Sequence, residues 1–306
     1  MGKKVFVSYS HVQGDWVRER LYPALKAGGA EVLIDVKRFQ AGVALYQQMD
    51  ASQDLADVHL LVLSPDYLGS AACTHEMNRA IALDPSFAKG CILPVVRVHC
   101  TLPPGIKAPN PLYVNIVDDA VSAPWDGIMK ACDTDLGAPV QHWLECLEDV
   151  KTRLGRQESV NLRVFGSPKW RELLDAVHES FSGRLGSVDM NSGEAAGQRN
   201  LVSAILLACG HHGAVGPTSD ELADLQIRIG NSAGAILELR HFDRVKDPDR
   251  QYRDAFFWAI NHLVENRKLS LLIQSRETLA ALVPPVLLQS SFVSQAKTVE
   301  LRGSKP

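Results

Sequence analysis

The amino-acid sequence predicts an α/β protein in which a parallel five-stranded sheet, with helices on both faces, is followed by a small all-α bundle. Three observations predict this fold class. Up to about residue 120, short apolar runs alternate with segments of helical period, which is the order typical of a parallel sheet. The apolar runs are continuous, which fits strands buried on both faces. Beyond residue 198 the apolar residues follow a helical period throughout.

The five expected strands share short runs of β-branched, aliphatic or aromatic residues, each bounded by a polar or glycine-containing turn. They are Lys4–Ser8, Glu31–Ile34, His59–Leu63, Cys91–Val98 and Leu112–Val117. Three helices are expected between them. Asp15 can cap the first, Leu45–Leu55 forms the second, and Ser70 can cap the third, which continues through Glu76.

The first domain is expected to cover residues 1–183, with its core at residues 3–135. Residues 184–198 are rich in Gly, Ser, Asn and Ala and have the composition of a linker. Residues 199–288 are expected to form the helical bundle, and residues 289–306 a polar tail. At the end of the first domain we expect a strand at Val160–Phe165 between the helices Gln141–Leu154 and Pro168–Phe181. In the bundle we expect four helices, at Leu201–Ala208, from Thr218, at Tyr252–Glu265 and at Leu269–Leu282.

Charge and composition exclude several function classes. The net charge is -3, from 32 basic and 35 acidic residues, so no electrostatic attraction to nucleic acid or an anionic membrane is expected. No apolar run approaches the ~20 residues that a membrane-spanning helix needs. The chain reaches its first strand at once, without a signal peptide, and its six cysteines form no CxxC pair. These features predict a cytoplasmic protein.

Chemistry-bearing residues follow three of the expected strands. The segments are Phe6–His11, Leu33–Gly42 and Leu61–Glu76. In a parallel sheet, ligands bind in the crevice at the carboxyl ends of the strands, so these three segments should meet there. Glu76 lies two turns into a helix that begins beside that edge. Its carboxylate is therefore expected to face the crevice.

These segments together resemble the TIR (Toll/interleukin-1 receptor) family. The resemblance rests on FVSYS, the aromatic residue of DWVRERL, the LIDVKRFQAG turn, the LLVLSPDYLGSAAC run, and a glutamate three residues after Cys73. It covers residues 3–83 in strict order and implies a flavodoxin-like fold. In enzymatic members a glutamate of this helix cleaves the bond between nicotinamide and ribose in NAD+, and by position that residue is Glu76. A carboxylate suits this reaction, because departure of neutral nicotinamide leaves positive charge on the ribose.

The resemblance also implies roles for other residues. Ser8, Tyr9 and Ser10 would contact the nicotinamide and ribose end of NAD+. The turn after the second strand would pack against a neighbouring subunit and complete the pocket, with a glycine that permits an unusual backbone conformation; its residues are Asp35, Arg38, Phe39 and Gly42. His11 is either an acid or base near the pocket or a loop residue. Cys73 lies on the same helix face as Glu76 and is expected to line the pocket.

The chain also departs from the family pattern. Many active members carry an aromatic residue just before the glutamate, where this chain has Ala72 and Cys73. Some carry a basic residue after the tyrosine, where this chain has Ser10 and His11. Both departures bear on the efficiency of NAD+ cleavage, and neither removes the carboxylate.

The helical region resembles, at Phe257–Ile273, the end of bacterial effector-associated domains. That resemblance implies a protein partner, and the mixed charges between Arg240 and Arg253 suit docking to a complementary surface. The alternative is a domain that senses a small nucleotide, but no aromatic and arginine set stands at a recognisable spacing. Cys209-Gly-His-His212 has no second Cys/His pair at ligand spacing, so a turn is expected there rather than a metal site.

Together these features predict a TIR-domain NAD+ nucleosidase that releases nicotinamide and ADP-ribose, or a cyclic form of it. It would be activated by oligomerisation through its TIR domains and act in bacterial antiphage immunity. NAD+ is the substrate, and no cofactor or metal is expected. The alternative is a non-catalytic TIR adaptor that acts by homotypic protein–protein contacts.

Overall fold

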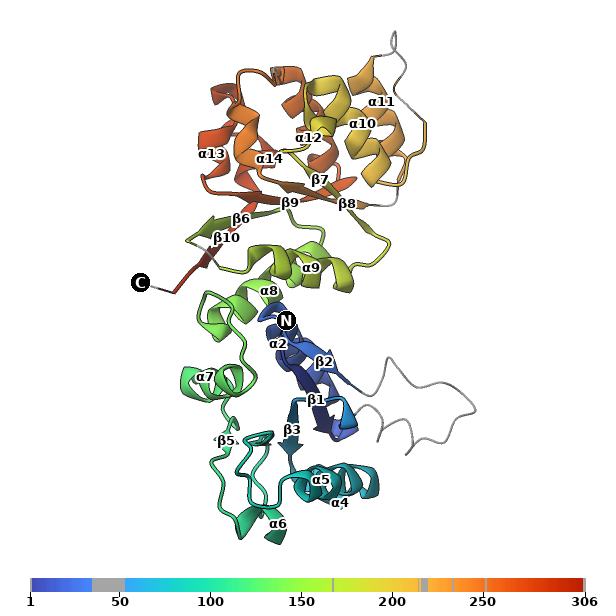
Figure 1. Ribbon diagram of the computed structural model, residues 1–306. Coiled ribbons are helices and arrows are strands. Elements are labelled where there is room, and N and C mark those ends of the chain that lie inside the picture. Colours follow the sequence, from blue (N-terminus) through green and yellow to red (C-terminus); the bar gives the residue numbers. More distant parts are fainter. Residues whose placement is uncertain are drawn as a thin grey trace. The chain divides into compact units, whose positions relative to one another are not determined.

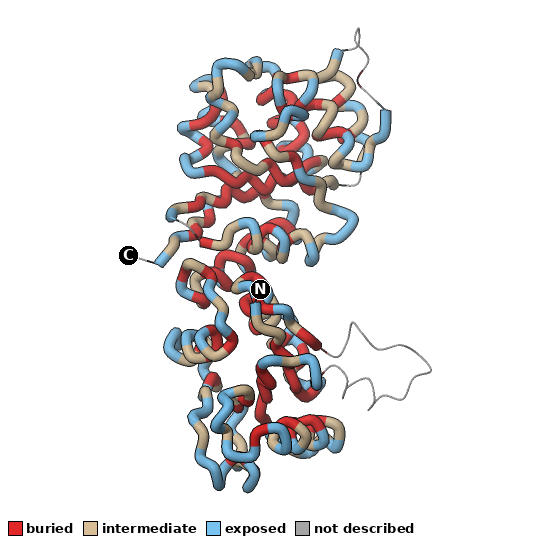
Figure 2. Tube along the Cα trace, viewed as in Figure 1, coloured by how far each residue is buried: buried red, intermediate tan, exposed pale blue. Residues whose placement is uncertain are grey.

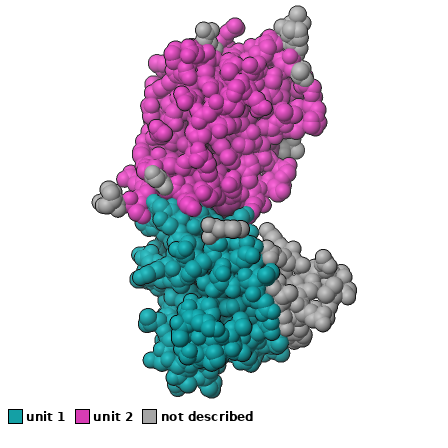
Figure 3. Space-filling model, viewed as in Figure 1, with its two compact units in different colours: residues 1–144 teal, residues 145–306 magenta. Residues whose placement is uncertain are grey.

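The computed structural model describes residues 2–34, 53–166, 168–213, 215, 220–232, 234–250 and 252–304 (Figure 1). The chain divides into two compact units, Met1–Leu144 and Glu145–Pro306 (Figure 3). Each unit contains its own five-stranded sheet, and every strand pair in both sheets is parallel. Among the described helices, none is long and apolar enough to span a membrane.

The sheet of the first unit has the strand order β2-β1-β3-β4-β5. This is the flavodoxin-like order, so the predicted fold class of this unit is confirmed. All six residues of the central strand β3 are buried, as expected for a strand covered on both faces. The strands are β1 (Lys4–Tyr9), β2 (Glu31–Leu33), β3 (Val58–Leu63), β4 (Ile92–Val96) and β5 (Val114–Asn115).

The helices of the first unit begin at short polar residues. The first helical segment is capped by Ser10, whose Oγ accepts the Val12 N–H, and not by Asp15 as predicted. Ser70 caps α5 (Ala71–Leu83) by accepting the Cys73 N–H, as predicted. The predicted helix Leu45–Leu55 lies mostly outside the described residues. The remaining elements are η1 (His11–Gln13), α1 (Gly14–Trp16), the π-helical η2 (Val17–Leu21), α2 (Tyr22–Ala27), α4 (Pro65–Gly69), α6 (Pro104–Lys107) and α7 (Ser122–Ala131).

A histidine is buried in the core of this unit. His59, on β3, is 2 % exposed, and its ring centroid lies 6.4 Å from that of Phe6. Burial lowers the pKa of His59 below 6.5; the Asp54 carboxylate opposes this shift and Arg79 adds to it. Nδ1 of this ring has no hydrogen-bond partner among the described residues. The folded chain therefore favours the neutral imidazole.

We expect the first unit to lose stability as the pH falls below the ordinary histidine value of 6.5. In that window the unfolded chain binds a proton that folded His59 does not, so unfolding is favoured by acid. Urea unfolding midpoints between pH 8 and pH 5.5 measure the effect. His59→Gln should flatten the pH dependence, whereas His11→Gln, at an exposed position, should leave it unchanged. Equal slopes for wild type and His59→Gln would contradict the assignment.

The second unit is not a helical bundle, which corrects the predicted fold of residues 199–288. Its sheet has the order β10-β6-β9-β8-β7. Helices α10 (Gln198–Ala208), α11 (Glu221–Gly230) and α12 (Asp254–Glu265) lie on one face of this sheet, and α9 (Trp170–Ser180) lies on the other (Figure 1). The strands are β6 (Val160–Phe165), β7 (Leu185–Asp189), β8 (Ala235–Arg240), β9 (Leu269–Ser275) and β10 (Lys297–Arg302).

Three predicted segments of this unit were wrong for physical reasons. Leu269–Leu282 was expected to be one helix, yet its first seven residues form β9, because a short continuous apolar run fits a doubly buried strand as well as a helix. The expected linker at residues 184–198 contains β7, which pairs with β8. The expected polar tail at residues 289–306 contains β10, which pairs along its whole length with β6.

The boundary between the units also differs from the predicted one at residue 183. The strand expected at Val160–Phe165 exists as β6, but it belongs to the second sheet. The helix α9 (Trp170–Ser180) is part of the same unit and buries Leu173, Leu174 and Val177. Helix α8 (Val140–Gly155) contains the boundary between Leu144 and Glu145.

The core of the second unit is a large apolar cluster between its sheet and helices α10 (Gln198–Ala208), α11 (Glu221–Gly230) and α12 (Asp254–Glu265) (Figure 2). Alternate residues of β9, such as Leu271 and Ile273, face this cluster. The short elements are η4 (Gly193–Ala195), η5 (Phe242–Lys246), α13 (Leu279–Leu282), η6 (Pro285–Leu287) and α14 (Ser291–Ser294).

Candidate active site

A buried carboxylate and two hydroxyl groups meet at the carboxyl edge of the first sheet. Ser8, near the end of β1, donates a short hydrogen bond from Oγ to Oε2 of Glu76 on α5. The same Oγ lies 2.7 Å from the hydroxyl of Tyr67 on α4. Glu76 is 4 % exposed, Ser8 1 % and Tyr67 0 %. Three elements of the fold, β1, α4 and α5, thus contribute one side chain each to this cluster.

Local sequence determines how α4 and α5 present these side chains. Ser64 follows β3 and caps α4 by accepting the Tyr67 N–H at 3.1 Å, and Pro65 stands at the first helical position, where its missing N–H costs nothing. Ser70 ends α4 and caps α5. Two capped helices in close succession therefore bring both Tyr67 and Glu76 to the residue at the end of β1.

The tyrosine of this cluster is held neutral. Burial raises the pKa of Tyr67 well above 10, and the nearby Glu76 and Cys73 raise it further, while the hydrogen bond with Ser8 opposes the shift. A neutral phenol can donate its proton to Ser8 while Ser8 donates to the carboxylate. Such a chain of hydrogen bonds orients the carboxyl group of Glu76 and gives its oxygen a donor in a buried place.

Two further residues support the position of α5. The amide Nε2 of Gln53, which is fully buried, donates to the backbone carbonyl of Glu76 at 2.8 Å. The thiol of Cys73 donates to the backbone carbonyl of Tyr9 at 3.6 Å. These contacts hold α5 against β1 and against the segment before β3. They therefore fix the backbone position from which the Glu76 side chain projects.

The structure brings together only some of the predicted site residues. Ser8 and Glu76 are hydrogen-bonded to each other, and Cys73 packs in the same apolar cluster as Tyr67. Tyr9 is buried and contributes its backbone carbonyl, whereas Ser10 uses its hydroxyl as a helix cap. His11 is exposed as the first residue of η1. The other predicted residues, Asp35, Arg38, Phe39 and Gly42, lie outside the described residues.

Sequence reasoning missed Tyr67 and Gln53. Tyr67 stands three residues after Ser64, and the Ser-Pro helix start predicts a first-turn residue that faces back toward the strand end. No comparable signal marks Gln53, because its role depends on a long-range contact to the Glu76 carbonyl. The predicted turn at Cys209 is present, with Gly210 at φ 82°. Within the described ranges, no group of three His, Cys, Asp or Glu side chains is placed to hold a metal ion.

Residues 5–128 match the TIR domain family. The chain therefore contains a TIR domain, and the match falls within the first compact unit. No functionally curated protein matches the sequence.

Solved structures are similar to parts of the chain at low identity. The TIR domain of the Toll-related receptor TRR-2 from Hydra magnipapillata is 16 % identical with a TM-score of 0.38, covering 42 % of this chain and 98 % of that one. Drosophila ORC bound to DNA is 10 % identical with a TM-score of 0.38, covering 54 % and 91 %. Drosophila ORC bound to AT-rich DNA and Cdc6 is 12 % identical with a TM-score of 0.38, covering 59 % and 58 %.

Proposed function

We propose that the chain is a TIR-domain NAD+ nucleosidase, with Glu76 as its catalytic carboxylate and with nicotinamide and ADP-ribose, or a cyclic form of it, as products. One observation supports this most directly. A glutamate carboxylate lies at the carboxyl edge of the TIR sheet, oriented by the Ser8 hydroxyl. That edge is where a flavodoxin-like sheet binds its ligands.

The carboxylate suits cleavage of the N-glycosidic bond of NAD+. The bond between the ribose and the nicotinamide ring breaks, the electron pair leaves with neutral nicotinamide, and positive charge develops on the ribose. An ionised carboxylate whose direction is already fixed stabilises that cation without reorganisation. Water then attacks the ribose carbon and loses a proton to give ADP-ribose, or the adenine of the same molecule attacks to give the cyclic product. In this mechanism Ser8 and Tyr67 act as positioning residues for Glu76.

The burial of Glu76 has a consequence for regulation. With 4 % of its surface exposed, this carboxylate cannot meet a ribose until the surrounding chain moves. We propose that self-association of TIR domains supplies this change, and that the second unit raises the effective concentration of TIR copies by binding a protein partner. Antiphage immunity in a bacterial cytoplasm is the setting that we propose for this activity.

The second candidate function is a TIR adaptor without catalysis. It is favoured by the same cluster, because a buried glutamate whose oxygen accepts a hydrogen bond from Ser8 also serves simply to hold α5 against β1. In an adaptor the surface of the TIR domain would recruit other TIR domains, and the carboxylate would never contact NAD+.

Release of nicotinamide from NAD+ distinguishes the two functions. We expect the purified full-length chain to release little at low concentration and much more, at equal total protein, when it is clustered on beads through a C-terminal tag. Clustered Glu76→Gln should release at least about a hundredfold less. If folded, clustered wild-type protein releases no nicotinamide, the adaptor function stands instead.

A further inference from the structure

The second unit contains a cavity that the proposed NAD+ chemistry does not use. Its volume is about 520 Å³, and it is lined from Val164 on β6 to Arg276 at the end of β9. Residues from the carboxyl ends of four strands, β6 to β9, contribute to its wall. A parallel sheet binds its ligands at this edge, and the volume falls in the range of about 300–1,000 Å³ typical of small-molecule sites.

Basic side chains converge on this cavity from three separate segments. Arg171 comes from the first turn of α9, His241 and Arg244 from the segment after β8, and Arg276 from the end of β9. Trp170 adds an aromatic wall, with its ring in edge contact with the His241 ring at 5.3 Å. This is the aromatic and arginine set that the sequence spacing did not reveal, because its three segments lie far apart in the chain and meet only through the parallel sheet.

The acidic groups near these basic side chains already accept hydrogen bonds from other groups of the protein. The carboxylate of Asp243, the acidic residue in the cavity wall, accepts the backbone N–H groups of Arg276 and Glu277. Asp189 lies 2.8 Å from the His241 ring. Partial burial opposes ionisation of Asp189, but the Asn191 N–H and His241 outweigh it and lower its pKa.

Nearby carboxylates only partly balance the positive charges of the arginines in the cavity wall. Arg244 donates from Nε to Oδ1 of Asn191 at 2.7 Å, and its Nη1 lies 3.9 Å from Asp247. In the described part of the chain, the Arg276 guanidinium forms no ion pair. The cavity therefore keeps a positive character.

A buried amide also faces the cavity. Gln274 is 4 % exposed and lines the wall. Its Oε1 accepts the backbone N–H of His241 at 2.7 Å, which fixes the orientation of the amide. Nε2 has no acceptor among the described residues and is left to donate to an occupant. His241 itself adopts a left-handed backbone conformation with φ 54°, a strained geometry that clusters at binding sites.

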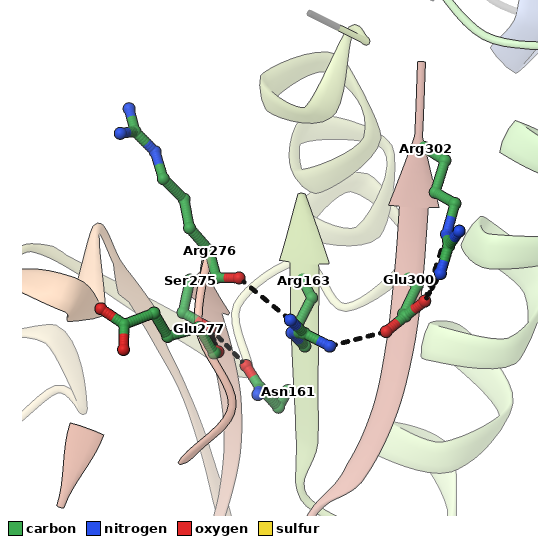
Figure 4. A network of polar contacts seen from close by, with 7 residues as sticks. All are labelled: Asn161, Arg163, Ser275, Arg276, Glu277, Glu300 and Arg302. Carbon is green, nitrogen blue, oxygen red and sulfur yellow. Dashed lines mark hydrogen bonds and ion pairs between the residues drawn. The ribbon is translucent and has the colours of Figure 1, made fainter. Parts of the chain in front are cut away.

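The wall beside the cavity is braced by the network of Figure 4. Arg163 on β6 bonds Glu300 on β10 at 2.7 Å and the backbone carbonyl of Arg276 at 3.4 Å. Ser275 donates to Oδ1 of Asn161 at 2.8 Å. Figure 4 shows the Arg276 side chain extending away from these contacts. The backbone of Arg276 is thus fixed, while its guanidinium stays available.

We propose that this cavity binds a phosphate-bearing small molecule of nucleotide size. Arg171, Arg244 and Arg276 supply charge-assisted hydrogen bonds to the phosphate, since guanidinium groups match its oxygens in geometry and charge. Gln274 donates a further bond from a fixed position. The cavity is far larger than the ~30 Å³ that one water occupies in the liquid, so an organic group fills the space beside Trp170. This proposal does not depend on cleavage of NAD+ by the first unit.

Calorimetric titration of the full-length chain tests the proposal. The probes are AMP, ADP, ATP and GTP, with adenosine, inorganic phosphate and pyrophosphate for comparison; none contains nicotinamide. We expect at least one nucleotide to bind, adenosine not to bind, and the inorganic anions to bind more weakly than the nucleotide. Arg276→Gln should weaken binding roughly tenfold or more, the scale of one lost charge-assisted contact.

Arg184→Gln is the matched control. Arg184 is exposed and stands immediately before β7, at the amino edge of the same sheet, opposite the cavity. It should leave nucleotide binding unchanged. No binding of any nucleotide up to millimolar concentration, or equal weakening by both variants, would overturn the proposal. Inorganic phosphate binding as tightly as the nucleotides would overturn the assignment of an organic ligand.

Discussion

Glu76→Gln is expected to reduce nicotinamide release by clustered protein by at least about a hundredfold, and up to about a thousandfold, the scale seen when one group that stabilises transition-state charge is removed. The amide keeps the volume of the carboxylate, and its oxygen can still accept the Ser8 hydrogen bond. The exchange removes the negative charge that the proposed role requires and replaces one carboxylate oxygen by an NH2 group. A loss of rate with an unchanged unfolding temperature therefore reports on chemistry rather than folding.

A matched variant separates this effect from a general change in charge. Glu19→Gln makes the same exchange on the exposed surface of η2 in the same unit. It should release nicotinamide at the wild-type rate. Initial rates should be compared at equal bead loading, with circular dichroism and thermal unfolding of each variant. Undiminished release by folded Glu76→Gln would rule out the proposed role of this carboxylate.

The first unit could be predicted well because its signals are local. Each strand of its sheet is an apolar run next to a polar turn, and Ser70 marks the start of α5 in the sequence. The place of Glu76 at the carboxyl edge follows from that order alone. Gln53 could not be assigned to the cluster, because its link to it is a tertiary hydrogen bond from its side-chain amide to the backbone carbonyl of Glu76, which no local pattern marks.

The second unit was mispredicted because two physical effects hide its strands. β8 contains Glu238, which breaks the apolar run but is fully buried, where its carboxylate pairs with His178 at 2.6 Å and Arg240 at 3.1 Å. β10 is an edge strand with exposed charged residues, so its sequence has the composition of a tail. Both segments become strands because of burial and strand pairing in the tertiary structure. Neither effect can be recognised from a short stretch of sequence.

The structure also bears on the expectation that the charges between Arg240 and Arg253 dock a partner, because Arg250 lies within that stretch. Its guanidinium donates to the backbone carbonyl of Ala195 at 3.0 Å, and the side chain is only 14 % exposed. Charge reversal there would break an internal contact before it reached any partner surface. Other, exposed residues would have to form the docking surface of the proposed partner.

Leu206→Ala is expected to destabilise the second unit by about 3 kcal/mol, with a range of about 2–5 kcal/mol for buried leucines. Leu206 is 1 % exposed on α10 and belongs to the apolar cluster, so its truncation leaves a cavity against the sheet. For a unit of this size, each kcal/mol lowers the unfolding temperature by about 2–4 °C. Calorimetry of the full-length chain should thus show a transition lowered by roughly 6–12 °C.

Leu207→Ala is the control on the same helix, because the neighbouring side chain is 60 % exposed. The two exchanges have the same effect on helix propensity, so a difference between them measures burial alone. Equal shifts would contradict the packing of α10 onto the second sheet.

The same pair of variants also tests the proposed dependence of NAD+ cleavage on the second unit. If the second unit concentrates TIR copies through its partner, then between the two unfolding temperatures partner-dependent nicotinamide release should be lost in Leu206→Ala and kept in Leu207→Ala.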